Sequence, residues 1–175
     1  MAGLCGRYGP VRLKPCRYFP ALVESIVSQQ LSTRAADTII ARLRERTRFT
    51  PAAMARVHPR RLRAAGLSRA KAGFLRELAR FADQGGLRGI RRLPDERVIE
   101  RLTEVKGIGV WTAEMFLIFA LQRPDVWPVG DGGIQRAARE LYGVDSREAL
   151  SALGERFRPT RSHAAWYLWR SLEKE

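Results

Sequence analysis

Apolar residues recur along most of the chain at the spacing of three and four residues that marks one face of an amphipathic helix. The segment 19–31 carries such a stripe, with Pro20 in its first turn, where proline is tolerated; the stripe is formed by Leu22, Val23, Ile26 and Val27. No segment alternates clearly with a period of two, so the pattern predicts no sheet. We therefore expect an all-α chain of about ten short helices.

Cap and turn residues divide this pattern into separate helices. Ser32, Thr50 and Ser68 stand where hydroxyl groups cap helix N-termini, and Gly66 and Gly85 stand where helices end. Toward the C-terminus the pattern predicts helices over Val110–Leu121, Ile134–Tyr142, Arg147–Phe157 and Ser162–Leu172. The irregular stretch 123–133 separates two of them, and loops on a rigid helical scaffold often carry function.

Composition adds a strong positive charge to this helical picture. The 175 residues suit one domain, or two small lobes that share a core. The chain has 32 Lys and Arg against 18 Asp and Glu, which gives a formal charge of +14. Such an excess favours a polyanionic partner, because neutralised phosphates release counterions. A genome that prefers arginine codons is the alternative, since net charge says nothing about fold or chemistry.

Thiols, histidines and hydropathy exclude several classes of protein. Cys5 and Cys16 cannot supply the four thiolates of an iron–sulfur cluster; they can pair or remain reduced, and reduced thiols suit a cytosolic protein. Neither His58 nor His163 stands at metal-ligand spacing, so no metal site is expected. No run is apolar enough for a signal peptide or a membrane span, and we expect a cytoplasmic protein, nucleoid-associated in a bacterium or archaeon.

Two glycines between predicted helices form the first motif with chemistry. In the string Val105–Ala113, Gly107 and Gly109 flank Ile108, so a backbone without Cβ atoms can press its N–H groups against a phosphate. A tight turn between helices explains the glycines equally well.

A single carboxylate forms the second motif. Asp131 lies between glycines directly before a predicted helix, where it can serve as an N-cap. A carboxylate at a helix N-terminus also stays ionised, so the same side chain can stabilise a developing positive charge.

The string Val105–Ala113 resembles the helix-hairpin-helix motif, near residues 102–115, of the HhH-GPD superfamily of DNA glycosylases. The resemblance extends over 18–170 and implies a fold of two helical lobes, with 1–17 as an N-terminal segment and no added sheet domain. It implies a DNA-backbone grip by Lys106, Gly107, Ile108, Gly109 and Thr112, and it makes Asp131 the catalytic carboxylate. The family often has proline where this chain has Lys106.

Trp111 directs the resemblance to one branch of the superfamily. Members that cleave the DNA strand carry a lysine at this position, so the resemblance implies no lyase activity. The chain is most similar to the alkylpurine branch, of the 3-methyladenine DNA glycosylase II type, and its C-terminal string Arg161–Arg170 sets Trp169 against Asp131. Trp111, Met115 and Trp169 would line the base pocket, although the branch often has tyrosine in place of Met115. Aromatic faces attract a cationic base by roughly 0.5–2 kcal/mol.

The resemblance also implies a wedge that fills the space of a flipped base. Gln30 is the first candidate and Leu31 the second, while Arg69 and Lys71 would reach phosphates. The family allows a monovalent cation on the hairpin carbonyls; no other cofactor is expected.

Together these features predict a monomeric, monofunctional glycosylase that removes cationic purines such as 3-methyladenine or 7-methylguanine from double-stranded DNA. Two alternatives remain open at this point. One is a DNA-binding or damage-sensing module without catalysis, and the other is a glycosylase for deaminated bases.

Overall fold

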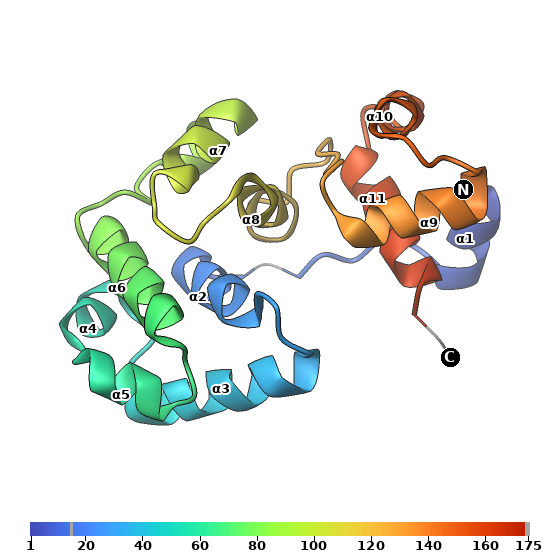
Figure 1. Cartoon of the computed structure of the whole chain (residues 1–175). Helices are drawn as coiled ribbons and strands as arrows, with labels where there is room; N and C mark the ends of the chain where they lie inside the picture. Colours follow the sequence, from blue (N-terminus) through green and yellow to red (C-terminus); the bar gives the residue numbers. More distant parts are fainter. Residues whose placement is uncertain (15, 174–175) are drawn as a thin grey trace. The chain divides into compact units, whose positions relative to one another are not determined.

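The computed structural model describes residues 1–14 and 16–173, and within them every regular element is helical (Figure 1). The all-α prediction is thereby confirmed. The chain divides into two compact units, one formed by residues 16–116 and the other by residues 1–15 together with 117–175. We call the first the hairpin unit and the second the aspartate unit, after the motif that each contains.

The hairpin unit is built around the apolar helix α2. Figure 1 shows α2 beside α3, α6 and α8, and the stripe 22–27 predicted from the sequence is buried against them. The helices of this unit are α2 (Tyr18–Ser28), α3 (Thr33–Arg46), α4 (Pro51–Arg56), α5 (Pro59–Ala64), α6 (Arg69–Asp83), α7 (Asp95–Thr103) and α8 (Val110–Met115), with a short 3₁₀ turn at Ile90–Arg92.

Helix starts in this unit follow the cap residues of the sequence. The hydroxyls of Ser32, Thr50 and Ser68 each accept a hydrogen bond from a first-turn backbone N–H, which satisfies one of the donors that a helix start leaves without a partner. His58 does the same for α5 through Nδ1, so it has a local structural role.

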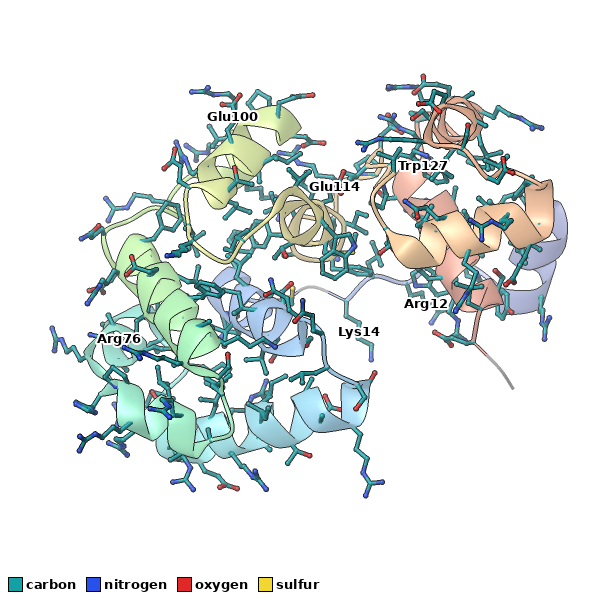
Figure 2. The ribbon with its side chains drawn as sticks, in the orientation of Figure 1. Arg12, Lys14, Arg76, Glu100, Glu114 and Trp127 are labelled. Carbon is teal, nitrogen blue, oxygen red and sulfur yellow. The ribbon has the colours of Figure 1, made fainter. Side chains whose placement is uncertain are left out.

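The aspartate unit packs the C-terminal helices around a small core. Its helices are α1 (Ala2–Tyr8), α9 (Gly132–Tyr142), α10 (Arg147–Glu155) and α11 (Arg161–Ser171). Ile134, Leu153 and Leu168 are buried in that core together with Trp127, which is labelled in Figure 2. The indole N–H of Trp127 donates to the carbonyl of Leu150 at 2.9 Å. The segment before Asp131 is thereby anchored to α10.

Three elements differ from the sequence-based expectation. Helix α2 ends at Ser28, three residues before the predicted end at Leu31, because the chain turns there. The helix predicted over Val110–Leu121 is α-helical only to Met115 and continues as a π-helical turn over Phe116–Ala120. Helix α1 has no counterpart among the predicted helices, since its two glycines lower helix propensity.

Candidate active site

Asp131 is a buried carboxylate at the start of helix α9. Its side chain is 7% exposed, and Oδ1 accepts a hydrogen bond from the backbone N–H of Ile134 at 2.8 Å, which makes Asp131 the N-cap of the helix. The same oxygen accepts a hydrogen bond from Nε1 of Trp169, also at 2.8 Å. The two donors fix the orientation of the carboxyl group at the start of the helix.

Aromatic rings stand beside this carboxylate. The rings of Trp169 and Phe119 lie 5.6 Å apart between centroids with an angle of 30° between their planes. Gly133 leaves the space in which Trp169 contacts Asp131. A Cβ on Gly133 would lie 3.0 Å from Oδ1 of Asp131 and 3.0 Å from Cδ1 of Trp169. The arrangement offers an anionic oxygen next to a flat apolar surface, as a cationic aromatic ligand requires.

The loop that carries Asp131 is tied to helix α11. Arg161 donates to both carboxylate oxygens of Asp125, at 2.8 and 3.1 Å, and Ser162 Oγ accepts from the backbone N–H of Val126 at 2.9 Å. Desolvation raises the pKa of Asp125, but hydrogen bonds from Arg161 and the charges of Arg161 and Arg158 outweigh it, so the pKa lies below its usual value. These bonds hold the loop at the start of the helix that also carries Trp169.

The hairpin between α7 and α8 is a tight turn with two different glycines. Gly107 has φ +95°, and a Cβ on it would lie 2.4 Å from the ring of Phe74, so only glycine fits. Gly109 has an ordinary φ of −96°, and a Cβ on it would meet no atom within 4 Å, which leaves its backbone open to a large neighbour. Lys106 next to them is exposed.

The predicted wedge residue lies in a turn of unusual backbone conformation. The N–H of Leu31 donates to the carbonyl of Ser28 at 3.1 Å, Gln29 has φ −50° and ψ 126°, and Gln30 has φ +58°. These angles match a type II β-turn with glutamine where glycine is preferred. A positive φ on a residue with a Cβ costs on the order of 1–3 kcal/mol, and such strain clusters at functional sites.

Exposure separates the residues of this turn. Gln30 and Leu31 are exposed, as wedge candidates must be, and Leu31 keeps 39% of its surface accessible. Gln29 is half-buried and points its amide inward, where Nε2 donates to the carbonyl of Gly107 at 2.9 Å. Their roles in DNA binding stay predictions.

Two residues expected to contact DNA, Thr112 and Ile108, have buried side chains, and the half-buried Lys71 is bound to backbone carbonyls of the protein. Thr112 is 2% exposed and Ile108 is 5% exposed, and the backbone N–H of Ile108 already donates to Val105. Lys71 directs its ammonium group to the carbonyls of Val27 and Gln29. A direct side-chain contact with phosphate is therefore not supported for Thr112 or Ile108, whereas Arg69 is exposed and available.

The other pocket residues divide between the units. Trp111 and Met115 stand four residues apart on α8 and so share one face of that helix, with Trp111 41% exposed. Trp169 and Asp131 lie together in the aspartate unit. Their common role in base recognition stays a prediction.

Two residues of the candidate site are missed by sequence reasoning. Phe119 lies in a continuous apolar run that is typical of core, although it is 38% exposed and stacks on Trp169. Gln29 stands in what the sequence shows only as a polar helix end, and its bond to Gly107 joins residues 78 positions apart. No local pattern could have shown either contact.

Cysteines and candidate metal ligands add nothing to the site. No disulfide joins Cys5 and Cys16, and burial raises the pKa of the Cys16 thiol. The described residues contain no cluster of three potential metal-ligating side chains and no helix long and apolar enough to cross a bilayer. The carbonyls of Val105 and Gly107 already accept hydrogen bonds within the protein. A monovalent cation on the hairpin carbonyls stays a prediction.

The chain has a helix-hairpin-helix motif and, later in the sequence, a buried aspartate that accepts a hydrogen bond from an indole. This combination is typical of base-excision DNA glycosylases. The family model described as "HhH-GPD superfamily base excision DNA repair protein" matches residues 23–159, and the chain belongs to this family.

Individual relatives carry the assignment to one branch. The chain is 34% identical over 179 aligned positions to "DNA-3-methyladenine glycosylase 1" of Schizosaccharomyces pombe, covering 96% of this chain and 78% of the relative. A crystal structure of a DNA-3-methyladenine glycosidase from Bacillus halodurans superposes with a TM-score of 0.86 at 37% identity, covering 97% of this chain and 82% of that one. The S. pombe enzyme Mag1, in complex with abasic DNA, gives 0.86 at 32% identity over 97% and 89%. The alkylpurine branch is thereby confirmed.

Proposed function

We propose that the protein is a monofunctional DNA glycosylase that removes alkylated, cationic purines from double-stranded DNA. The observation that carries this proposal is the pair of hydrogen bonds, from Ile134 and Trp169, that fixes the buried side chain of Asp131 in one orientation. The relatives of the chain that are named 3-methyladenine glycosylases, and the relative bound to abasic DNA, support the same reaction.

The chemistry follows from a purine methylated on N3 or N7, which carries a positive charge. As the bond from C1′ to the base breaks, its electron pair moves to the base, which leaves neutral and needs no proton from an acid. The sugar becomes cationic at C1′, and a fixed carboxylate lowers the energy of that state. Water then adds to C1′ and loses a proton, for which Asp131 is the acceptor.

Trp111 supports hydrolysis by water without strand cleavage. An indole has no amine that could attack C1′ and form an imine with the sugar. The expected product is an abasic site with both strands intact. A borohydride-trapped covalent adduct between protein and DNA would contradict this part of the proposal.

The positive charge of the chain supports double-stranded DNA as the binding partner. A formal charge of +14 favours a duplex, because phosphate contacts release condensed counterions. We propose that the hairpin glycines and Lys106 meet the phosphate backbone and that Gln30 enters the space left by the flipped base. The protein would act as a monomer on DNA in the cytoplasm or nucleoid.

A panel of duplexes, each with one lesion, tests the proposal. The panel holds 7-methylguanine, 3-methyladenine, hypoxanthine and uracil, and the release of free base is measured for the wild type and for Asp131→Asn. We expect release of the methylated purines by the wild type only. Binding without release of any base would favour the non-catalytic module, and preferential release of hypoxanthine or uracil would favour a glycosylase for deaminated bases.

A further inference from the structure

The wedge turn, defined as residues 28–31, is not held by packing. It borders a hollow of about 240 Å³ whose lining includes Gln29, Gln30, Leu31, Gly66, Ser68 and Lys71. Gln30 and Leu31 are exposed, so close-packed neighbours do not fix them. Yet a turn with a positive φ at Gln30 persists only where its surroundings determine it.

Lys71 supplies the first restraint. From the first turn of α6, its ammonium group donates to the carbonyl of Val27 at 2.7 Å and to the carbonyl of Gln29. These carbonyls stand at the C-terminal end of α2, where helix carbonyls lack backbone partners and a positive charge is favoured. Desolvation lowers the pKa of Lys71, in keeping with a group taken partly out of water.

Gln29 supplies the second restraint and connects the turn to the hairpin. The backbone carbonyl of Gln29 is bound by Lys71. The side-chain Nε2 of Gln29 donates to the carbonyl of Gly107 at 2.9 Å and lies 3.5 Å from Oγ1 of Thr112. Phe74, one turn beyond Lys71 on α6, packs on Gly107 so closely that a Cβ there would clash. One helix therefore supports both the wedge turn and the hairpin.

We propose that Lys71 and Gln29 are positioning residues that fix the wedge turn to the hairpin, so that the hairpin's hold on DNA sets where Gln30 enters the base stack. The proposal rests on the proposed glycosylase function and deepens it. Neither residue is catalytic, and the ammonium group of Lys71 acts on protein carbonyls. The rigid connection matters because a wedge displaced by even one side-chain width would meet the neighbouring base instead of the gap.

Two substrates that differ only in the need for a wedge provide the test. One duplex carries a single 7-methylguanine paired with cytosine, and the other carries the same base unpaired in a one-nucleotide bulge. Single-turnover base release is measured on both for the wild type, Lys71→Met and Gln29→Leu. On the paired lesion both variants should be slower by roughly tenfold or more, the usual effect of losing a hydrogen bond that involves a charged or buried group. On the bulge they should stay within about twofold, because an unpaired base costs little to flip.

Three further variants make the comparison specific. Arg80→Met also removes a positive charge from α6, but the guanidinium of Arg80 is exposed and bonds to Glu77, so both rates should remain unchanged. Gln30→Ala removes the wedge itself and should reproduce the selective loss. The double variant of Lys71 and Gln29 should be no slower than the slower single variant, since both act through one connection.

Each contrary outcome has a distinct meaning. Equal losses on the paired and bulged lesions would assign Lys71 and Gln29 a purely structural role and overturn the proposal. Wild-type rates for both variants would overturn it as well, and so would a Gln30→Ala variant without selectivity, because there would be no wedge to position. If the wild type released no base from either substrate, the proposed glycosylase function would be wrong, and this inference would be wrong with it. That outcome differs from all the others, because they require base release by the wild type.

Discussion

Trp169 donates its indole hydrogen to the same oxygen of Asp131, Oδ1, that caps helix α9 through the backbone N–H of Ile134. One carboxylate oxygen is therefore held by two donors from two different helices. Trp169 thus does more than form an aromatic wall, because it orients the group proposed to stabilise the cationic sugar.

Replacing Trp169 by phenylalanine separates the two roles of the indole. Trp169→Phe keeps a ring beside Phe119 but removes the donor to Asp131, so the single-turnover rate on a paired 7-methylguanine should fall by about tenfold. Trp166→Phe is the matched control, because Trp166 contacts Tyr167 and Arg170 instead. A wild-type rate for Trp169→Phe would show that the hydrogen bond plays no part in catalysis.

Asp131→Asn should remove activity without removing the fold. Asparagine caps helices about as well as aspartate, so the melting temperature should change little. The neutral amide cannot balance a cationic sugar, and base release should fall by roughly 10²–10³-fold or more. Affinity for DNA that contains an abasic-site analogue, measured by fluorescence anisotropy, should remain. Full activity in this variant would exclude Asp131 as the catalytic group.

The elements and cap residues of this fold are largely predictable, because periodicity and capping are local properties. Ser32 and Ser68 cap helices as their sequence positions indicate, and the stripe 22–27 is buried. Helix α1 is not predictable, since its glycines disfavour a helix in isolation. Contacts within the aspartate unit stabilise it, including the hydrogen bond from Met1 to Tyr142.

The candidate site is predictable only in part. Asp131 and the hairpin carry recognisable strings, but the π-helical turn at Phe116–Ala120 lies in a run that is apolar on every side, where periodicity does not distinguish α from π. That turn carries Phe119. The bond from Gln29 to Gly107 depends on tertiary structure alone.

Gly133 should be needed for the geometry at Asp131. In Gly133→Ala the new Cβ would lie 3.0 Å from Asp131 Oδ1 and from Trp169 Cδ1, which displaces the indole and should slow base release at least several-fold. Gly132→Ala is the adjacent control, because no atom lies within 4 Å of its Cβ position, and it should keep the wild-type rate. Equal rates for the two variants would contradict the predicted crowding.

Acid should weaken the connection between the loop that carries Asp131 and helix α11. The pKa of Asp125 is lower in the folded state than in the unfolded state, so its stabilising contribution is fully present above the unfolded value, about 3.9, and is lost as the pH falls through the folded value. Denaturant titrations from pH 7 to pH 2 should therefore show a smaller loss of stability at low pH in Asp125→Asn than in the wild type. Parallel curves would contradict this assignment.

Two hairpin glycines should separate folding from DNA binding. Gly107→Ala places a Cβ against Phe74 at a positive φ and should lower the free energy of unfolding by roughly 1–3 kcal/mol, measured by urea denaturation. Gly109→Ala meets no neighbour and has an ordinary φ, so stability should change by less than about 0.5 kcal/mol. Its methyl group would nevertheless keep the backbone away from a phosphate, and affinity for a duplex should fall. If Gly109→Ala bound DNA as tightly as the wild type, the hairpin would be a structural turn and the phosphate contact would have to lie elsewhere.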